Sequence, residues 1–238
     1  LVKSAKAKKA TRIVSIFVNP DQFSPNEDFD KYPSTIKNDL KLLRKERVDI
    51  VFLPNKEEIK KYKIKYKIPN FSIENKLCGK TRPHFFPGVK KIVTKLFDII
   101  EPDKSFFGEK DFQQYLVIKE LCKKMKLKTV IVKCKTVRDQ KGLALSSRNN
   151  YLNEKEKKMA QKINKSVKKF LPFFRENLKV GRGTLKLKQD LFKHGIDSID
   201  YLKIFTEQLT IRKKLNDKCR LFIAVKIGNT RLIDNYKI

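Results

Sequence analysis

The hydrophobic pattern of the first 134 residues alternates between short apolar runs and longer periodic segments. The runs are rich in β-branched and aromatic residues and predict strands, at 12–18, 48–54, 105–107 and 129–134. In the segments between them, apolar residues recur every three or four positions and predict helices, at 35–46, 87–100 and 111–124. Strands that alternate with helices favour a parallel sheet covered on both faces, so the first two runs are expected to be buried.

The pattern changes near residue 151. A lysine-rich amphipathic helix is predicted at 154–174, followed by a glycine-containing turn at 181–183 and a helix at 185–193. Three further apolar runs predict strands, at 199–205, 220–227 and 231–238. The sequence therefore predicts an α/β domain over residues 1–151 and a small α+β domain over residues 152–238.

Composition places the chain among globular proteins. Its 238 residues can bury a sizeable core, and 40% of them are hydrophobic. No apolar run approaches the roughly 18 residues that a membrane span needs. Residues 1–9 lack the hydrophobic stretch of a signal peptide. We therefore expect a cytoplasmic protein without a membrane partner.

Cysteine and histidine usage argues against a zinc site or a disulfide framework. No pair of cysteines has C-x-x-C spacing, and the chain has only two histidines, His84 and His194. We expect reduced, mostly buried thiols and assign no metal ligand. The cysteines are Cys78, Cys122, Cys134 and Cys219.

The net charge of +31 arises from 57 lysine and arginine residues against 26 acidic ones. One interpretation is a basic RNA-binding protein, which would need clustered basic residues beside exposed aromatic rings. Here the lysines are spread along the whole chain, and most aromatic residues lie within apolar runs. Compositional bias with solvated faces fits better, so we expect no specific nucleic-acid partner. A positive field would also attract anionic substrates.

Two amide side chains, Asn19 and Gln22, directly follow the first predicted strand. Amides donate and accept hydrogen bonds without charge, so together they can orient a hydroxy acid and a carboxylate. The alternative is a turn in which Asn19 bonds its own backbone before Pro20.

A glycine and a lysine follow the third predicted strand, in Gly108-Glu109-Lys110-Asp111. Glycine lets a ligand approach the backbone, and the N-terminus of the next helix favours anions, so the segment can cradle a phosphate. The alternative is a capping box between Asp111 and Gln114. Both interpretations can hold for Asp111, but they compete for the side chain of Gln114.

Two hydroxyl groups and a guanidinium stand together in Ser146-Ser147-Arg148. Arginine binds phosphate oxygens as a fork and serine adds neutral donors, so this segment suits a polyphosphate. The alternative is an exposed polar turn before the helix predicted from Glu154.

In this order and spacing, the motifs resemble the pantothenate synthetase (pantoate–β-alanine ligase) family over essentially the whole chain. The shared blocks are FVNPxQF (17–23), YP (32–33), CGxxRP (78–83), FFGEKDxQQ (106–114), TVRDxxGLALSSRNxYL (136–152) and IGNTRLIDN (227–235). The resemblance implies a Rossmann-like fold of the nucleotidyltransferase superfamily. It also implies condensation of pantoate with β-alanine, using ATP and Mg²⁺, through a pantoyl adenylate with release of pyrophosphate. A homodimer is implied as well. The alternative enzyme is another adenylyl- or cytidylyltransferase of the same superfamily.

Site residues follow from the resemblance by motif match. Those that would contact ATP are Gly108, Glu109, Lys110, Asp111, Val137, Leu145, Ser146, Ser147 and Arg148. Val137 and Leu145 would flank the adenine, and Lys110 would neutralise charge on the phosphates.

The acid substrates would be bound by amides. Gln22 and Gln114 would bind pantoate, Gln22 would also lie near β-alanine, and Asn19 would position the reacting groups. The residues expected to act in catalysis are Lys110, Arg148, Ser146, Ser147 and Asn19. Positioned cations and donors would supply most of the catalysis, without a covalent nucleophile.

Two departures from the family pattern matter. The H-x-G-H motif of the family is absent, and Leu1 to Lys6 match the helix that follows it. The family pattern R-P-x-H-F is replaced by Arg82-Pro83-His84-Phe85-Phe86, so the histidine has moved one place, whereas Arg82 still matches. We therefore expect the chain as given to be an incomplete form, poorly stable and weakly active or inactive.

Overall fold

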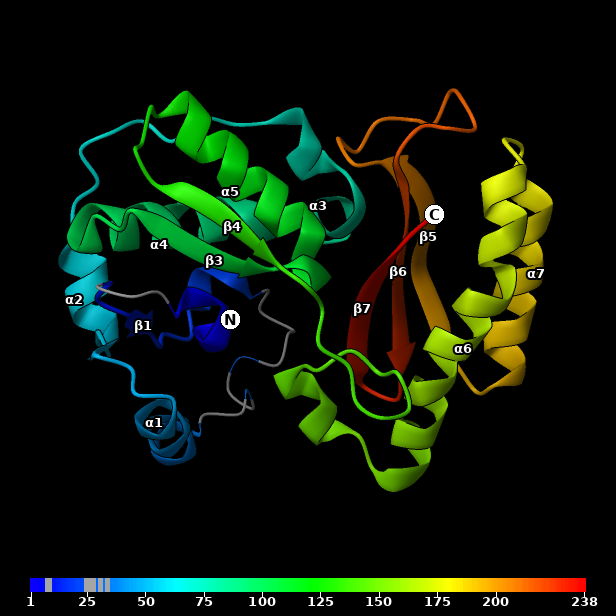
Figure 1. The fold of residues 1–238 in the computed structure, drawn as a ribbon, viewed down its shortest axis with the longest axis horizontal. Coiled ribbons are helices and arrows are strands. Elements are labelled where there is room, and N and C mark those ends of the chain that lie inside the picture. Colours follow the sequence, from blue (N-terminus) through cyan, green and yellow to red (C-terminus); the bar gives the residue numbers. More distant parts are fainter. Residues whose placement is uncertain (7–9, 24–28, 30–31, 33–34) are drawn as a thin grey trace. The chain divides into compact units, whose positions relative to one another are not determined.

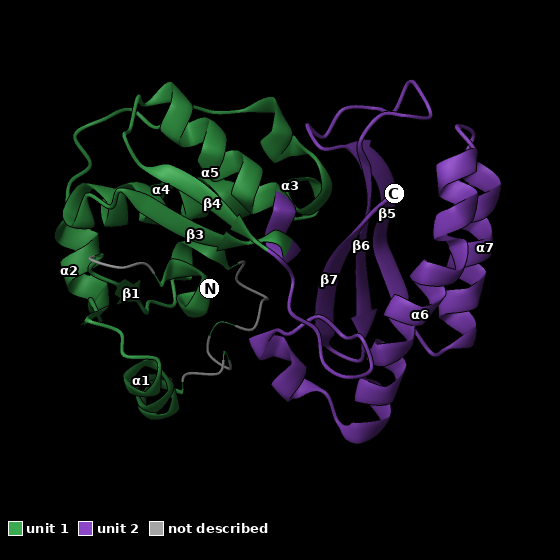
Figure 2. Cartoon of the chain, viewed as in Figure 1, with its two compact units in different colours: residues 1–109, 113–134 green, residues 110–112, 135–238 purple. Residues whose placement is uncertain are grey.

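The computed structural model describes residues 1–6, 10–23, 29, 32 and 35–238 (Figure 1). Pro33 of the YP block lies outside these residues. The chain forms two compact units, unit 1 (1–109 and 113–134) and unit 2 (110–112 and 135–238), coloured separately in Figure 2. This division differs from the predicted boundary at residue 151 by the segments 110–112 and 135–151, which belong to unit 2.

Unit 1 contains two pairs of parallel strands. Strand β1 (Ile13–Ser15) pairs with β2 (Ile50–Phe52), and β3 (Lys104–Gly108) pairs with β4 (Val130–Cys134). The predicted parallel pairing is thereby confirmed. No ladder joins the two pairs within the described ranges, so they form two separate two-stranded sheets rather than one.

The prediction that β1 and β2 are buried is wrong. Ile13 is 38% exposed and Ile50 is 49% exposed. A parallel strand is buried on both faces when it lies inside a continuous sheet covered by helices. In the part of the chain that the structure describes, β1 and β2 pair only with each other and are shorter than predicted.

The three helices predicted in this region are present, with ends within two residues of the predicted ones. Two shorter helices, α2 and α3, were not predicted because six and five residues are too few to show periodicity. The helices are α1 (Ile36–Lys45), α2 (Lys56–Lys61), α3 (Leu77–Thr81), α4 (Phe85–Ile100) and α5 (Phe112–Lys124). Single 3-10 turns are η1 (Val2–Ala5), η2 (Pro20–Gln22), η3 (Ser72–Asn75) and η4 (Glu109–Asp111).

Helices α4 and α5 supply the core of unit 1. Their buried apolar side chains pack in one cluster with Ile59 of α2. The α4 and α5 members are Val89, Ile92, Val93, Phe97, Ile118, Leu121 and Cys122. This cluster holds α5 in place, and α5 is the helix that begins directly after the Gly108 segment.

A buried ion pair lies beside this core. Lys90 Nζ is 2.8 Å from Glu74 Oε1, and the two side chains are only 1% and 8% exposed. The ammonium group also donates to the Pro69 carbonyl (2.6 Å) and to Asn70 Oδ1 (3.1 Å). The same Glu74 oxygen accepts a hydrogen bond from the Phe71 N–H, so both charges have partners.

Unit 2 combines an antiparallel sheet with two helices. The sheet has the order β5 (Ser198–Thr206), β6 (Cys219–Ile227), β7 (Thr230–Lys237). Helices α6 (Glu154–Glu176) and α7 (Gly181–Lys193) and the 3-10 helix η5 (Ser147–Tyr151) precede it. The three predicted strands and the long helix are confirmed.

The predicted turn at 181–183 is wrong, because these residues form the first turn of α7. A Cβ on Gly183 would lie 2.4 Å from the Phe173 ring, so glycine here allows α7 to pack closely on α6. Glycine was taken as a turn signal, whereas it is needed for close packing.

One face of the antiparallel sheet packs on α6 and α7. Alternate residues of β6 and β7 lie in a cluster with both helices, as expected for a strand period of two. The strand members are Leu221, Ile223, Val225, Ile227, Leu232 and Tyr236, and the helix members include Ile163, Val167, Leu187 and Leu191.

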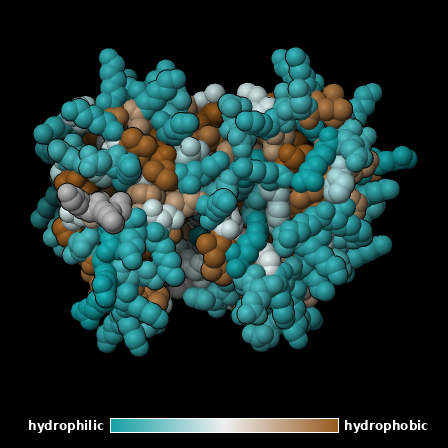
Figure 3. Space-filling view, in the orientation of Figure 1, coloured by the Kyte–Doolittle hydropathy of each residue, from teal (hydrophilic) through white to brown (hydrophobic). Residues whose placement is uncertain are grey.

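The surface and the cysteines agree with the composition. Hydrophilic residues dominate the face in Figure 3, with hydrophobic residues scattered among them.

All four cysteines are free and buried, as predicted, and burial raises the pKa of Cys122 to about 11. In the described ranges, we find no helix both long and apolar enough to span a membrane.

Candidate functional site

Strand β3 ends at Gly108, where the sequence predicts a phosphate cradle. A Cβ on Gly108 would meet no atom within 4 Å, so the backbone faces open space at this point. The next residue, Glu109, is paired with Lys133 of β4 at 3.4 Å, and the Lys133 ammonium lies 5.7 Å from the Tyr115 ring centre. The end of β3 is therefore accessible, and the carboxylate of Glu109 beside it is held by Lys133.

Lys110 and Asp111 follow in unit 2. The Lys110 side chain is 17% exposed, and its Nζ lies 3.5 Å from Asp111 Oδ1, at the limit of a hydrogen bond. The Lys110 ammonium group therefore keeps most of its capacity to donate to a further acceptor.

The two glutamines of the FFGEKDxQQ block have different environments. Gln113 is buried; it donates to the carbonyls of Ile73 (2.8 Å) and Lys76 (2.6 Å) and accepts from the Cys78 N–H. Gln114 is half-buried, and no hydrogen bond engages its side chain in the part of the chain that is described. Gln113 thus has a structural role, and the amide of Gln114 is available to a ligand.

Asn19 forms the turn that was the alternative interpretation. Its side chain is buried, donates to the Gly88 carbonyl (3.1 Å) and accepts from the Asp21 N–H (3.3 Å). These bonds fix the backbone of η2, which carries Gln22. Asn19 therefore contributes by shaping this turn, and its catalytic role stays a prediction.

Arg82 is a residue whose role the sequence did not reveal. Its Nη2 donates to the Gln22 carbonyl at 2.8 Å, and its guanidinium lies 4.2 Å from the Phe85 ring centre. Phe85 occupies the position of the family's histidine, and the shifted His84 is the N-cap of α4. Arg82 thus holds the residue expected to bind pantoate and β-alanine, and its place in the CGxxRP block was the available signal.

Val137 and Leu145 are neighbours across a hairpin in unit 2. The Leu145 N–H donates to the Val137 carbonyl at 2.9 Å, beside an antiparallel bridge between Arg138 and Ala144. Their apolar side chains are 63% and 54% exposed. Directly paired residues lie on one face of a ladder, so they form an exposed apolar pair that suits a flat ring.

The turn of this hairpin is built around Asp139. Its carboxylate accepts from the N–H groups of Lys141 (2.9 Å) and Leu143 (2.8 Å) and from Gln161 Nε2 (2.9 Å). Burial would raise the pKa of Asp139, but the hydrogen bonds from Gln161 and the backbone outweigh burial and lower it. The ionised carboxylate therefore holds the turn at neutral pH.

The hairpin leads directly into Ser146 and η5. Ser146 is the N-cap of η5, and its Oγ accepts from the Arg148 N–H at 3.3 Å. A pocket of about 680 Å³ opens here, a volume typical of small-molecule sites. Its lining residues are Asp139, Gln140, Lys141, Leu143, Leu145, Ser146, Ser147, Asn149, Asn150, Lys157 and Gln161.

These observations define a mixed α/β protein with candidate ligand-binding groups in both units. Polar groups follow a parallel strand in unit 1, which is where ligands bind in such folds, and a hairpin in unit 2 borders an open pocket of small-molecule size.

Comparison with known proteins identifies the family. The model of the pantoate–β-alanine ligase family matches residues 1–237. The chain belongs to the pantoate–β-alanine ligase family, which confirms the enzyme class expected from the sequence motifs.

Individual relatives match nearly the whole chain. The pantothenate synthetase of Carboxydothermus hydrogenoformans is 41% identical over 239 residues, which are 99% of this chain and 84% of that protein. The pantothenate synthetase of Thermosipho africanus is 38% identical, over 99% of this chain and 85% of that protein.

Solved structures also match. The pantothenate synthetase of Thermus thermophilus has a TM-score of 0.85 and 32% identity, covering 94% of this chain and 82% of that one. The pantoate–β-alanine ligase of Francisella tularensis, in complex with β-γ ATP and β-alanine, has a TM-score of 0.81 and 35% identity. The match covers all of this chain and 83% of the Francisella tularensis chain.

Proposed function

We propose that the chain binds ATP, pantoate and β-alanine and condenses the two acids into pantothenate through a pantoyl adenylate. The observation that carries this proposal is the exposed Val137–Leu145 pair, which leads directly into the hydroxyl groups of Ser146 and Ser147. An apolar pair followed by phosphate-binding groups suits a nucleotide. The ligands of the Francisella tularensis structure support the same assignment.

In the first step, a carboxylate oxygen of pantoate attacks the α-phosphorus of ATP, and pyrophosphate leaves. Lys110 and Arg148 would balance the negative charge that builds up, and Ser146 and Ser147 would donate to phosphate oxygens. The open backbone at Gly108 would let the nucleotide approach β3, with Glu109 and Asp111 beside it.

In the second step, the amine of β-alanine attacks the acyl carbon of the adenylate, and AMP leaves. Gln22 and Gln114 would orient pantoate, and Gln22 would also contact β-alanine. Neighbouring hydrogen bonds position both glutamines. Arg82 and Asn19 fix the backbone at Gln22, and Gln113 fixes the start of α5, which carries Gln114. Catalysis would come from positioning and charge stabilisation.

Mg²⁺, which the family resemblance implies, prefers phosphate and carboxylate oxygens and keeps several waters. No group of three His, Cys, Asp or Glu side chains that could hold a metal occurs in the described ranges. This fits an ion held mainly by ATP phosphates, whose charge it would neutralise. The partly exposed carboxylate of Asp111 is suited to assist.

The proposal is tested by calorimetric titration of the chain with ATP and by mass-spectrometric detection of pantothenate from ATP, pantoate and β-alanine. Other amines and phosphorylated acceptors are then substituted for β-alanine and pantoate. Binding of ATP with turnover of pantoate supports the ligase, and a preference for a phosphorylated acceptor would favour another nucleotidyltransferase. Absence of ATP binding would contradict the proposal.

The weak activity or inactivity expected in the sequence analysis stays a prediction. The same assay checks it, because turnover comparable to that of the Francisella tularensis enzyme would contradict it. The homodimer implied by the family also stays a prediction, which light scattering can check.

We further infer that unit 1 has a Rossmann-like fold of the nucleotidyltransferase type. Its two parallel strand pairs and the helices packed on them support this. A functional boundary near residue 151 remains part of the proposal, because it keeps Val137 to Arg148 with the other expected ATP-binding residues.

Gly108→Ala should weaken ATP binding about tenfold or more, because a methyl group would fill the space through which the nucleotide reaches the backbone. The free protein should keep its stability, since a Cβ there meets no neighbour. Gly181→Ala is the matched control: its Cβ also meets no atom within 4 Å, at the start of α7. Calorimetric titration checks both variants, and equal ATP affinity for the two would remove Gly108 from the site.

A further inference from the structure

Asp234 and Asn235 end the IGNTRLIDN block, to which the sequence assigned no role. We propose that these two residues are positioning residues for ATP: Asp234 fixes the hairpin 137–145, and Asn235 fixes Lys110. This inference rests on the proposed function, because both segments are expected to contact the nucleotide.

The two side chains lie on opposite faces of β7, as adjacent strand residues do. Asp234 shares a face with Leu232 and Tyr236, which belong to the core formed with α6 and α7. Asn235 is paired with Phe222 of β6 on the other face. One dipeptide can therefore hold two different segments of unit 2.

Asp234 holds the hairpin through Arg138. The guanidinium donates twice to the carboxylate, with Nη1 2.5 Å from Oδ2 and Nη2 2.9 Å from Oδ1. The same Nη1 donates to the Gly142 carbonyl at 3.1 Å, on the other side of the turn. A fork of this kind fixes both position and orientation, so Asp234 sets where the hairpin lies.

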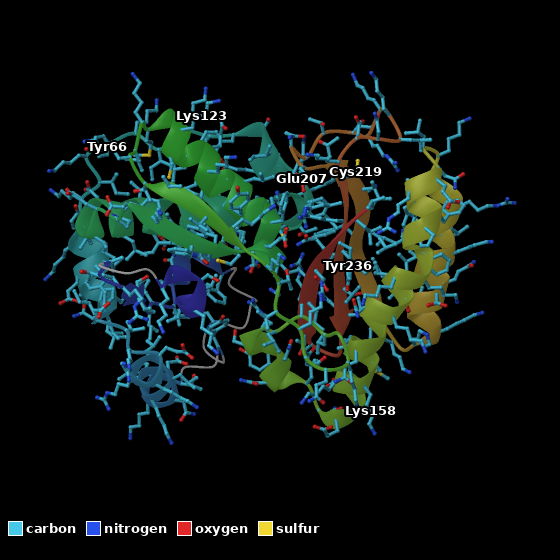
Figure 4. The ribbon with its side chains drawn as sticks, in the orientation of Figure 1. Tyr66, Lys123, Lys158, Glu207, Cys219 and Tyr236 are labelled. Atoms are coloured by element: carbon cyan, nitrogen blue, oxygen red, sulfur yellow. The ribbon has the colours of Figure 1, made fainter. Side chains whose placement is uncertain are left out.

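Tyr236 supports this pair from β7, where Figure 4 labels it. Its hydroxyl donates to Asp234 Oδ2 at 2.7 Å, and its ring centre is 4.8 Å from the Arg138 guanidinium. Burial first, and then the neighbouring Asp234 carboxylate, raise the pKa of Tyr236 well above that of a free phenol. The hydroxyl therefore remains a donor at any physiological pH.

Asn235 holds the backbone of Lys110. Its Nδ2 donates to the Lys110 carbonyl at 3.0 Å, and its Oδ1 accepts from Arg220 Nη1 at 2.6 Å. The Arg220 side chain is 2% exposed, and its guanidinium lies 4.2 Å from the Phe112 ring centre. The residues on both sides of Asp111 are thus fixed against β6 and β7.

The consequence is that one strand sets in advance both the hairpin expected to flank the adenine and the backbone of Lys110, which is expected to face the phosphates. Preorganised donors stabilise a transition state because they need no reorganisation when charge develops. A small displacement of either segment should therefore weaken ATP binding without unfolding unit 2.

Asn235→Asp isolates the Lys110 half. The carboxylate still accepts from Arg220 but cannot donate to the Lys110 carbonyl, so that hydrogen bond is lost. We expect about tenfold weaker ATP binding and an unchanged thermal midpoint. Amide hydrogen exchange should become faster at 110–112 and stay unchanged at 139–145.

Asp234→Asn isolates the hairpin half, because an amide offers Arg138 only one acceptor oxygen. Exchange should become faster at 139–145 and stay unchanged at 110–112, again with about tenfold weaker ATP binding. Asp200→Asn is the matched control. Asp200 binds Arg231 at 2.6 Å on the same sheet, with similarly buried side chains, and Asp200 and Arg231 lie outside the expected ATP segments.

The two variants test the two contacts separately. The proposal is supported if exchange becomes faster only at 110–112 in Asn235→Asp and only at 139–145 in Asp234→Asn, with weaker ATP binding in both. An Asp200→Asn variant that behaves like Asp234→Asn would overturn it. Unchanged exchange in both variants would overturn it as well. If the parent chain binds no ATP, the proposed function fails, whereas the exchange pattern still decides whether Asp234 and Asn235 fix these segments.

Discussion

Replacing Lys110 with methionine should weaken ATP binding by about 10- to 150-fold, because a hydrogen bond to a charged group contributes about 1.5–3 kcal/mol. The fold should not change, since the 3.5 Å contact with Asp111 is the one polar contact of the Lys110 ammonium among the described residues and the Lys110 carbonyl keeps its bond to Asn235. Calorimetric titration with ATP measures the effect, and detection of pantoyl adenylate extends it to the first chemical step.

Lys169→Met is the control for Lys110→Met, because any lost charge slightly reduces the attraction of a chain with net charge +31 for ATP. Lys169 lies on α6, is 64% exposed and binds Asp190 at 2.9 Å. Its loss should change ATP affinity by less than about twofold, since salt screens distant exposed charges. Equal weakening in both variants would mean that Lys110 acts only through the overall field.

Replacing Lys90 with methionine should lower the free energy of unfolding by about 3–5 kcal/mol, because it leaves the buried Glu74 carboxylate without its cation. The carbonyl of Pro69 and the side chain of Asn70 would lose a donor as well. Urea unfolding followed by circular dichroism measures this difference.

The adjacent Lys91 provides the control for Lys90→Met. It binds Asp21 at 2.7 Å, but the two side chains are 53% and 45% exposed, so Lys91→Met should cost no more than about 1 kcal/mol. Adding Glu74→Gln to Lys90→Met removes the unpaired charge and should recover part of the loss. If Lys90→Met costs no more than Lys91→Met, the buried pair does not stabilise unit 1.

Helix α4 illustrates which parts of the fold the sequence could predict. Its apolar residues recur every three or four positions, and the residues buried in the core follow that spacing: Val89, Ile92, Val93 and Phe97. The helix begins at Phe85, two residues before the predicted start at Pro87. Periodicity over sixteen residues carries enough local information, whereas strands of three residues, such as β1 and β2, carry too little to predict their exposure.

The candidate site divides in the same way. Gly108, Lys110 and Ser146 to Arg148 could be predicted as candidates because their proposed chemistry depends on residue types that are adjacent in sequence. The bonds from Asp234 to Arg138 and from Asn235 to Lys110 join residues 96 and 125 positions apart. No local pattern contains such pairs, so their proposed positioning role could be inferred only from the folded unit.

The hairpin between β6 and β7 turns through only Gly228 and Asn229, with Ile227 paired to Thr230. Gly228 has a φ of 54°, and its N–H donates to Asp197 Oδ2 at 2.6 Å. If one residue were inserted in this turn and the strands stayed hydrogen-bonded, every following side chain of β7 would turn to the other face of the sheet. Asp234 would then take the place of Asn235 beside the Lys110 carbonyl, and Ile233 would take the place of Asp234 beside the Arg138 guanidinium. Exposed turns usually accept insertions during evolution, but a change of length here would displace at once both segments that we propose contact ATP.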